Sequence, residues 1–417
     1  MDNIFYSEIY TAQFMYDIII IGAGIAGLHC AYRLQNHYDK ILVLEENSCI
    51  GGRIKTVQIH GNTIEAGAGR LNQTHRLYSS LLKELHLETK PIDGIIQHYD
   101  TDSLFHLQNP FTTLDKVLKV AKTESTQKLQ QLSFLQYAKT ILTKNEIEFV
   151  VGAFGYYQQL AEMNAFNAIK LFDKGMHSKN KFEIVNGGMS QVIYKLYNKI
   201  KKKCAVYCKQ TVSAVTYNES MSHFEVFVEG KFKPFIAKYC IAAIPKYSLQ
   251  KLDYCKPFRS LLNTIEVKIL CRIYAFFHKK DIWFYDLLKT TVNNEIRYII
   301  PIDRENGVIM ISYTDSHFAQ FWAKLPEKEV IPTLKLKLGE ALHREIPTPK
   351  DVRAFYWNTG TAFWKPTVDS KKIARSILQP IPTEPFFICG ENYSETQGWI
   401  EGALETSTEV IESICKV

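Results

Sequence analysis

The chain of 417 residues is 46% hydrophobic and 22% charged, the balance of an ordinary globular protein with a sizeable core. At about 150 residues per domain, this length predicts two or three domains. The net charge of +7 is mildly basic and argues against a site that collects polycations such as polyamines. The densest basic run, residues 199–203, is more typical of a solvated helix end than of a nucleic-acid patch, so we expect no nucleic-acid partner.

Nine cysteines are scattered along the chain in an odd number. Cys204 and Cys208 have no second pair nearby, so we expect free thiols in a reducing compartment and no metal site. The first fifteen residues carry Asp2 and Glu8 without a long apolar core, so a secretory signal is not expected. No apolar stretch approaches the roughly 20 residues that cross a bilayer, so we expect no membrane span and a cytoplasmic location.

The N-terminal part of the chain alternates between strand and helix patterns. Residues 16–21 form a β-branched run that is typical of a buried parallel strand. A glycine turn follows, and residues 26–35 then have helical spacing of their apolar side chains. Residues 41–44 form a second buried strand. This order predicts a βαβ unit and therefore a parallel sheet.

The middle of the chain changes character twice. Residues 77–172 have the pattern of long helices, with an exposed polar helix over residues 122–131. Strand and turn patterns return at Ile184, and residues 265–313 are typical of antiparallel strands. The last 30 residues predict a strand, a loop and a helix. The sequence therefore predicts a mixed α/β fold with an additional antiparallel part.

A dinucleotide-binding fingerprint follows the first strand. Gly22, Gly24 and Gly27 have the spacing G-x-G-x-x-G at the start of the predicted helix, and Glu45 ends the next strand. Gly22 allows the tight turn, Gly24 lets a pyrophosphate approach the backbone, and Gly27 lets helix and strand pack closely. The helix N-terminus offers N–H groups to phosphates, while Glu45 accepts hydrogen bonds from ribose. The alternative is a βα turn that binds no nucleotide.

Two further small-residue segments favour FAD over NAD. Gly51-Gly52-Arg53 lies just beyond Glu45, and residues 65–70 read Glu-Ala-Gly-Ala-Gly-Arg. Small residues admit a long cofactor into an extended groove, and arginines meet pyrophosphate oxygens or the polar edge of a flavin. For either arginine alone, the alternative is a surface ion pair.

These motifs, together with three later ones, resemble the signature of the flavin amine oxidase superfamily. That superfamily includes monoamine and polyamine oxidases, L-amino-acid oxidases and flavin histone demethylases, with phytoene desaturases and protoporphyrinogen oxidases as more distant relatives. The later motifs are residues 186–189 (Asn-Gly-Gly-Met), 242–245 (Ala-Ala-Ile-Pro), and 389–391 with 398–403. The resemblance spans residues 16–417.

The resemblance implies a Rossmann-like FAD-binding domain that is discontinuous in sequence and a substrate domain built from an antiparallel sheet plus helices. We expect residues 1–80, 181–250 and 371–417 in the FAD-binding domain. Residues 81–180 and 251–370 are expected in the substrate domain.

The same resemblance implies how FAD is held. The covalent-flavin members have a cysteine in a turn that here spans residues 357–364, where none is present, so we expect non-covalent FAD. The helix that starts near Trp399 would point its positive end at the flavin pyrimidine ring. The expected cofactor-binding residues are Gly22, Gly24, Ala26, Gly27, Glu45, Glu46, Gly52, Arg53, Gly67, Ala68, Gly69, Arg70, Val212, Gly390, Glu391, Trp399 and Ile400.

Family oxidases often place two aromatic rings before the flavin face. Trp399 matches one of these rings. The other comes from the turn over residues 357–364, where Ala362 can occupy the ring position and Phe363 or Trp364 can line the pocket instead. For Phe363 and Trp364, the alternative is plain core packing.

The family also carries a lysine, bridged by water to the flavin, on a strand of the substrate domain. Here that position aligns with Arg272, and Lys268 is the alternative. An arginine cannot act as a base, but it can hold a water molecule or bind a substrate carboxylate in a fork. The alternative without a catalytic role is a strand-edge arginine paired with a surface acid. The predicted catalytic residues are therefore Arg272, Trp399, Trp364 and Phe363.

Three runs, residues 272–275, 297–302 and 309–315, resemble amine-oxidase-like flavoproteins of large DNA viruses, which would place the protein in host cytoplasm or a virion. We expect an enzyme that moves a hydride from an amine or amino-acid-like small molecule to flavin, with dioxygen as acceptor. The alternatives are a desaturase or dehydrogenase with another acceptor, and a non-catalytic flavin-binding structural protein of a virus particle. We expect a monomer or homodimer.

Overall fold

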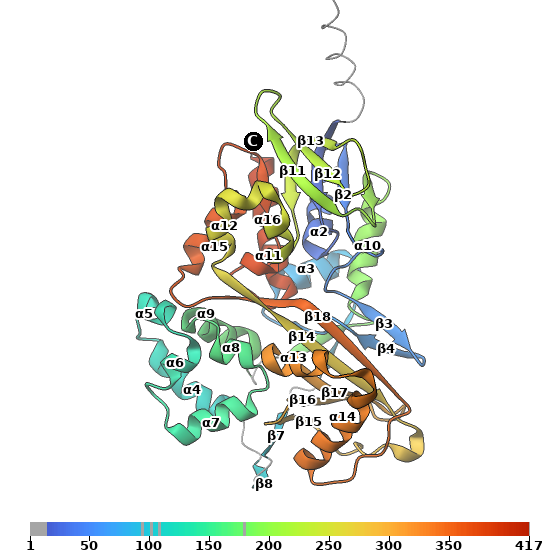
Figure 1. The fold of residues 1–417 in the computed structure, drawn as a ribbon, viewed down its shortest axis with the longest axis vertical. Helices are drawn as coiled ribbons and strands as arrows, with labels where there is room; N and C mark the ends of the chain where they lie inside the picture. Colours follow the sequence, from blue (N-terminus) through green and yellow to red (C-terminus); the bar gives the residue numbers. More distant parts are fainter. Residues whose placement is uncertain (1–14, 93–95, 101–102, 107–109, 178–180, 417) are drawn as a thin grey trace, which may run out of the picture.

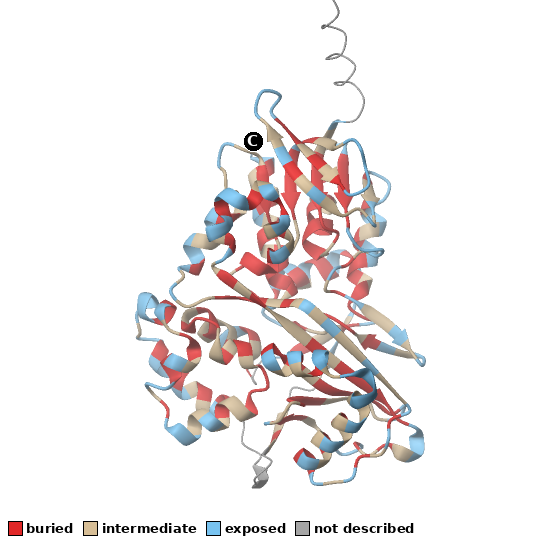
Figure 2. Ribbon diagram, viewed as in Figure 1, coloured by how far each residue is buried: buried red, intermediate tan, exposed pale blue. Residues whose placement is uncertain are grey.

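The computed structural model describes residues 15–92, 96–100, 103–106, 110–177 and 181–416. Two large sheets organise the chain, one in the upper half of Figure 1 and one in the lower half. Buried residues concentrate along both sheets and on the helix faces against them, as Figure 2 shows.

The first sheet is the predicted parallel sheet with an antiparallel extension. Strands β10, β2, β1, β13 and β19 run parallel, and β12 and β11 continue antiparallel from the first half of β13. Their bounds are β1 Met15–Ile21, β2 Ile41–Leu44, β10 Cys204–Tyr207, β11 Val212–Asn218, β12 His223–Val228, β13 Phe235–Ala242 and β19 Phe386–Ile388.

Burial of β1 on both of its faces explains why the first apolar run of the sequence is continuous. Ile18 and Ile20 pack on one side with α2 (Ile25–Leu34), while Ile19 and Ile21 pack on the other side with β12. A strand covered on both faces needs apolar side chains in both alternating positions. Helices α10 (Ser190–Ile200) and α16 (Ile400–Cys415) complete the layer around α2.

The second sheet has the order β18-β14-β17-β16-β15-β7-β8. Its neighbours pair antiparallel, apart from the parallel pair β15 and β7. The bounds are β7 Ile96–Asp100, β8 Ser103–His106, β14 Ile265–Phe276, β15 Lys289–Val292, β16 Tyr298–Asp303, β17 Val308–Asp315 and β18 Asp351–Trp364. Helices α13 (Ser316–Lys324) and α14 (Glu327–Leu342) follow β17.

The prediction of long helices over residues 77–172 was wrong. Strands β6 (Thr89–Ile92), β7 and β8 interrupt this region, and the helices are short because capping residues such as Ser133, Thr143 and Asn164 start new ones. The helices are α3 Arg76–Glu84, α4 Pro110–Ala121, α5 Thr126–Gln131, α6 Phe134–Ala138, α7 Lys144–Ala153, α8 Tyr157–Ala161 and α9 Ala165–Lys170, with a π-helical turn at Leu171–Met176.

The smaller elements connect these layers. The remaining strands and helices are β3 Thr56–Ile59, β4 Asn62–Glu65, β5 Leu71–Asn72, β9 Phe182–Val185, α11 Lys246–Lys251, α12 Arg259–Leu262 and α15 Ser370–Leu378, with 3-10 turns at Asp253–Phe258, Lys279–Asp281 and Glu391–Tyr393.

The strands of the first sheet all fall within residues 15–44, 204–242 and 386–388, and those of the second within 96–106 and 265–364. This distribution agrees with a discontinuous first unit, while the exact domain boundaries stay a prediction. In the part of the chain that the structure describes, no helix is both long enough and apolar enough to cross a membrane.

Candidate functional site

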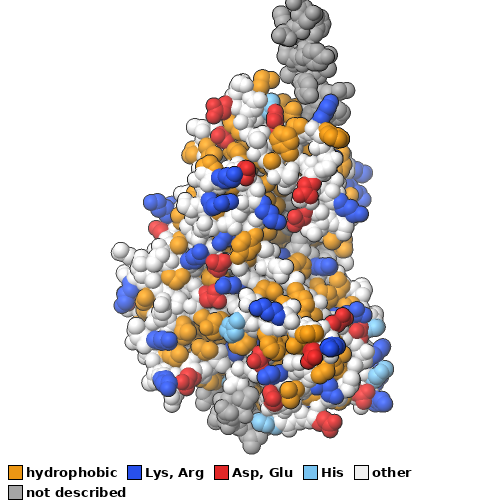
Figure 3. Space-filling view, in the orientation of Figure 1, with side chains coloured by type: hydrophobic (Ala, Val, Ile, Leu, Met, Phe, Trp, Pro, Cys, Tyr) orange, Lys and Arg blue, Asp and Glu red, His pale blue; other side chains and the backbone are white. Residues whose placement is uncertain are grey.

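A cavity of about 1270 Å³ lies where the carboxyl ends of β1 and β2 face strands β14 and β17. Ile21 and Leu44 line it from the first sheet, and Arg272 and Tyr313 from the second. Ligands of open α/β sheets bind outside the carboxyl ends of the strands, so its place is that of a nucleotide site. On the face that Figure 3 shows, basic and acidic side chains are interspersed.

The glycine fingerprint has the geometry that a pyrophosphate needs. Gly22 has φ of 101°, and a Cβ there would lie 2.6 Å from the Ala243 carbonyl oxygen. A Cβ on Gly27 would lie 2.0 Å from the Gly22 carbonyl oxygen, so Gly27 serves helix–strand packing and does not line the cavity. Gly24 lines the cavity with open space where a Cβ would stand. Phosphate oxygens can therefore approach the start of α2.

Glu45 is buried at the end of β2 and lines the cavity. Its Oε2 accepts a hydrogen bond from the Ala23 N–H at 2.8 Å, which ties the carboxylate to the glycine turn. Its Oε1 accepts from the backbone N–H of Asn47 at 2.9 Å and the Asn47 side chain at 2.7 Å. Each carboxylate oxygen has two lone pairs, so Oε2 keeps one acceptor site for a hydroxyl.

Glu391 joins three segments that are far apart in sequence. Its Oε2 accepts from the Arg53 guanidinium at 2.7 Å, and its Oε1 accepts from the backbone N–H of Gly398 at 2.7 Å and of Ala362 at 3.3 Å. Arg53 also donates to the Gly360 carbonyl oxygen at 3.0 Å. The first arginine motif, the C-terminal half of β18 and the start of the C-terminal helix are thus fixed relative to one another along one cavity wall.

Glu65 fastens the second small-residue segment to the Asn-Gly-Gly-Met turn. Its Oε1 accepts from the Met189 N–H at 2.8 Å, and Thr56 donates to the same carboxylate. Burial raises the pKa of Glu65, while these hydrogen bonds oppose the shift. A Cβ on Gly188, which has φ of 100°, would lie 2.4 Å from Thr56. The two motifs therefore form one structural unit.

Residues of the second sheet pack directly against the segment from Gly67 to Arg70. A Cβ on Gly69 would lie 2.9 Å from the Arg272 guanidinium, and one on Gly67 would lie 3.2 Å from the Trp357 ring. The Trp357 indole donates to the Ala66 carbonyl oxygen at 2.6 Å. Gly69 therefore makes room for a side chain of β14, and Gly67 makes room mainly for the Arg53 carbonyl oxygen, 2.0 Å from its Cβ position, and then for the Trp357 ring.

Arg70 and Trp399 lie close together on the cavity wall. The Arg70 guanidinium is 4.2 Å from the Phe182 ring centre and 5.7 Å from that of Trp399. Trp399 also stacks with Phe182 at 6.3 Å and meets the edge of His75 at 4.7 Å. Burial lowers the pKa of His75 to about 4, so this imidazole is neutral at pH 7. Among the described residues, no carboxylate lies within ion-pair distance of Arg70.

Arg272, rather than Lys268, lines the cavity. It donates to the Glu65 carbonyl oxygen at 2.9 Å, and its guanidinium lies 4.6 Å from the ring centre of Tyr313, its cross-strand neighbour. Lys268 instead forms an ion pair with Glu162 at 3.1 Å. Arg272 has no such carboxylate within the described residues, which disfavours the surface-pair alternative.

Phe363 and Trp364 do not line the cavity. Phe363 packs in the core of the helical region, and the Trp364 indole donates to the Ser394 carbonyl oxygen at 3.0 Å within a core of the first sheet. Their placement favours the core-packing alternative for both. Thr361 lines the cavity from the same strand, β18, so the expected turn over residues 357–364 is instead a strand segment with a register shift opposite residues 268–270.

Tyr156 and Tyr313 are cavity-lining aromatic residues that sequence reasoning missed. Their ring centres are 5.4 Å apart, and Tyr156 lies between α7 and α8 while Tyr313 lies on β17. No motif marks either one. The pairing of Tyr313 with Arg272 depends on strand register, which a single sequence does not reveal.

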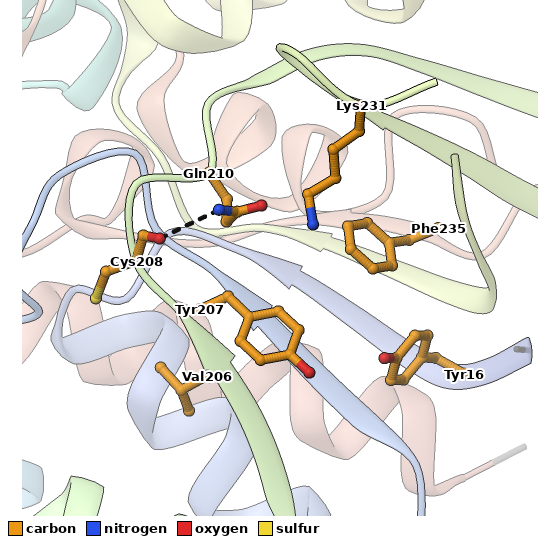
Figure 4. A pocket seen from close by; sticks show the side chains of 7 residues that line it. All are labelled: Tyr16, Val206, Tyr207, Cys208, Gln210, Lys231 and Phe235. Atoms are coloured by element: carbon orange, nitrogen blue, oxygen red, sulfur yellow. Dashed lines mark hydrogen bonds between the residues drawn. The ribbon is translucent and has the colours of Figure 1, made fainter. Parts of the chain in front are cut away.

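A second, more open recess of about 600 Å³ lies on the first sheet, and Figure 4 shows its lining side chains. The Lys231 ammonium lies 4.8 Å from the ring centre of Phe235, and the Gln210 side chain donates to the Cys208 carbonyl oxygen at 3.3 Å. Gln210 lines both recesses.

The cavity residues fit FAD. The open approach at Gly24, the carboxylate of Glu45 and the start of α16 at Ile400 supply groups for pyrophosphate, ribose and a flavin ring respectively. Of the seventeen predicted cofactor-binding residues, Gly27 alone does not line the cavity.

Comparison with known proteins agrees with this geometry. Residues 25–146 and 118–410 match the sequence profile described as "Flavin containing amine oxidoreductase". "Amine oxidase [flavin-containing] A" of Bos taurus is 36% identical, over 97% of this chain and 86% of the relative. The "Putative L-amino-acid oxidase YobN" of Bacillus subtilis is 24% identical, over 94% of this chain and 93% of the relative.

Two further matches extend the comparison. "Uncharacterized protein R188" of Acanthamoeba polyphaga mimivirus is 22% identical, over 95% of this chain and 93% of the relative. The structure of putrescine oxidase bound to putrescine superposes with a TM-score of 0.76 at 18% identity, covering 97% of this chain and 99% of that one. The profile and the bovine relative both span most of the sequence, and the chain therefore belongs to the flavin-containing amine oxidoreductase family.

Proposed function

We propose that this oxidoreductase binds FAD non-covalently and oxidises a small amine that carries an anionic group close to the amino nitrogen, as an amino acid does. When bound, FAD supplies the hydride acceptor, and dioxygen takes up the two electrons and two protons as hydrogen peroxide. The oxidised C–N bond then hydrolyses in water to a carbonyl compound and an amine or ammonia.

The observation that carries the substrate class is the half-buried Arg70. Its guanidinium lies against two rings on the cavity wall, and the described residues offer it no carboxylate. Arg272 adds a second such cation to the cavity. Half-buried guanidinium groups are normally paired, and a planar fork matches a carboxylate in two parallel hydrogen bonds. An anionic group on the substrate would supply a carboxylate that neither the described residues nor the polar edge of a flavin offers.

The aromatic side chains that line the cavity would position the substrate. Trp399 is held between Phe182 and His75, so its ring can form one fixed wall of the reaction slot. Tyr156 and Tyr313 line the cavity from the substrate side and are candidates for the opposite wall. Such fixed walls bring the reacting C–H bond to a near-attack distance.

Three features support non-covalent FAD in a reducing compartment. Residues 357–364 of β18 contain no cysteine, and a Cβ on Gly360 would lie 2.5 Å from the Leu270 side chain, which leaves no room for a cysteine at that position. All cysteines in the described part of the chain are free thiols. Host cytoplasm is the location that we propose.

The substrate class is tested by comparing amino acids with the amines that lack their carboxylate. We expect kcat/KM to favour the amino acid by roughly tenfold or more, since a charge-assisted hydrogen bond contributes on the order of 1.5–3 kcal/mol. Arg70→Gln should abolish this preference, while Arg375→Gln, an exposed arginine outside the cavity, should retain it. Equal rates for both substrate sets would overturn the anionic-substrate proposal. Turnover without peroxide would favour a dehydrogenase with another acceptor.

A further inference from the structure

Strand β17 ends in a buried carboxylate two residues beyond Tyr313. Asp315 is fully buried, and its two carboxylate oxygens accept the backbone N–H groups of Tyr157 at 3.0 Å and Gln158 at 3.3 Å. These are the first two residues of α8, which has no capping side chain of its own because Tyr156 precedes it. Asp315 therefore satisfies two N–H groups that a helix start leaves without partners.

The segment that Asp315 holds is a wall of the cavity. Tyr156 and Gln158 both line the cavity. Gln158 is one of the two residues whose N–H groups Asp315 accepts, and Tyr156 directly precedes the other. The Tyr156 ring contacts Tyr298 at 4.9 Å and Tyr313 at 5.4 Å, and the buried Gln158 side chain donates to Thr361 on β18. A shift of this short segment would change the shape of the cavity and the contacts of both side chains.

The charged surroundings of Asp315 come from several elements. Arg297, from the loop before β16, is buried and donates to the Val151 carbonyl oxygen at 2.7 Å, with its guanidinium 4.7 Å from the Phe318 ring centre. Glu162, at the end of α8, accepts from Ser316 at 3.0 Å and pairs with Lys268 at 3.1 Å. Among the described residues, the titratable groups that interact electrostatically with Asp315 or with its neighbours Arg297 and Glu162 include Tyr298, Glu295, His317 and Lys268.

We propose that Asp315 is a positioning residue, whose ionised carboxylate holds the Tyr156–Gln158 wall of the substrate cavity and whose protonation loosens that wall. A protonated carboxyl keeps one oxygen as a good acceptor and turns the other into a hydroxyl, so it cannot hold both N–H groups equally well. Burial raises the pKa of Asp315 to about 7, although its two N–H bonds and Arg297 oppose the shift. The change between the two states therefore falls near neutral pH.

Amide hydrogen exchange of the FAD-loaded, full-length protein tests the positioning directly. We compare Asp315→Asn with wild type at pH 6, 7 and 8, with Asp253→Asn as the control because Asp253 is exposed and outside the cavity. Comparison at one pH cancels the intrinsic exchange rate. Peptides that cover residues 156–161 should be at least tenfold better protected in wild type than in Asp315→Asn at pH 8, and nearly equal in the two at pH 6.

A wild-type measurement keeps the inference testable if Asp315→Asn does not fold. Protection of residues 156–161, corrected for the intrinsic rate, should rise from pH 6 to pH 8 relative to α10 in the same molecule. Protection that is independent of pH, or that is unchanged in a folded Asp315→Asn, would overturn the inference.

The consequence for catalysis rests on the proposed function. In wild type, KM for the amino substrate should fall between pH 6 and pH 8 by more than in Asp315→Asn, with a smaller change in kcat. If no amine or amino acid reduces the wild-type flavin, the proposed function fails, while the exchange experiment still decides the role of Asp315.

Discussion

Arg53 and Glu391, which are 338 residues apart, form an ion pair of 2.7 Å on the wall of the central cavity. Glu391 is buried, and its carboxylate also accepts the N–H of Gly398 just before Trp399. This single side chain connects the N-terminal nucleotide motifs to the C-terminal flavin motif. The relationship brings the two ends of the chain together along one wall of the cavity that we propose for FAD.

Glu391→Gln should weaken FAD binding by roughly tenfold to a hundredfold. The amide keeps one acceptor oxygen and replaces the other with an NH2 group, so either the Arg53 guanidinium or the Gly398 N–H loses its acceptor, and a buried group left unpaired costs about 1–3 kcal/mol. The FAD Kd of apoprotein, measured by flavin fluorescence, checks this. Glu412→Gln, on the exposed part of α16, is the matched control and should bind like wild type. An unchanged Kd for Glu391→Gln would show that this ion pair is not part of the FAD site.

Glu45→Ala should also reduce FAD occupancy, because it removes the proposed acceptor for ribose and releases the N–H of Ala23 in the glycine turn. We expect roughly a tenfold loss of affinity per lost charge-assisted bond. Asn47→Ala removes one donor to Glu45 and spares the carboxylate, so it should retain most of the affinity. Full FAD occupancy of purified Glu45→Ala would mean that the fingerprint is misassigned.

Trp399→Ala should slow flavin reduction by the substrate about a hundredfold, while the visible spectrum of the flavin changes little. The ring is held by Phe182 and His75, so its loss removes a fixed wall and with it the near-attack geometry. Stopped-flow reduction under anaerobic conditions measures this step. Tyr194→Ala, an exposed aromatic residue outside the cavity, serves as the control. A wild-type reduction rate in Trp399→Ala would place the reaction slot elsewhere.

Arg272→Lys distinguishes the two roles that an arginine can have at this position. If Arg272 binds a substrate carboxylate in a fork, lysine should raise KM about tenfold or more, because an ammonium is a point charge without the planar pair of donors. If the site needs only a cation that holds water, kcat and KM should stay close to wild type. Steady-state kinetics with an amino acid and its decarboxylated amine separate the two outcomes.

Titration of Asp315 should lower the free energy of unfolding as pH rises, although the same titration increases the local order of residues 156–161. Burial raises the pKa of this carboxyl from 3.8 when unfolded to about 7 when folded, so the folded state holds the proton more tightly. The resulting contribution to the free energy of unfolding is on the order of 4 kcal/mol. It is present in full below pH 3.8 and is lost as pH rises to about 7.

Urea unfolding of FAD-free protein at pH 5 and pH 8 measures this contribution. Wild type should lose more stability over that interval than Asp315→Asn, which cannot titrate. The same loss in both proteins would show that Asp315 titrates in its ordinary range.

Local sequence patterns were sufficient for the parallel sheet. The continuous apolar run over residues 16–21 and the glycines at 22, 24 and 27 predicted a strand, a turn and a helix that the structure confirms. The antiparallel strands over residues 265–313 and the last strand and helix are confirmed as well. In each case, the period of the apolar residues and the turn chemistry point to the same element.

The sequence did not predict which side chains from different elements meet in the cavity or in the cores. Phe363 and Trp364 neighbour Ala362 in sequence, yet both point into cores, because the register of β18 is set by its pairing with β14. Tyr156 enters the cavity because a carboxylate from β17 fixes the start of α8. Both results depend on strand register and on contacts between distant segments, which one sequence does not specify.

The most direct test of the central claim is anaerobic mixing of the purified yellow protein with amino acids and with the corresponding amines. Our account predicts that at least one amino acid bleaches the flavin absorbance in a first-order reaction, that oxygen restores the absorbance with release of hydrogen peroxide, and that acid precipitation leaves FAD in the supernatant. A flavin that dithionite reduces but that no amine or amino acid in the panel bleaches would contradict the account. It would favour instead a flavoprotein in which the site no longer oxidises amines.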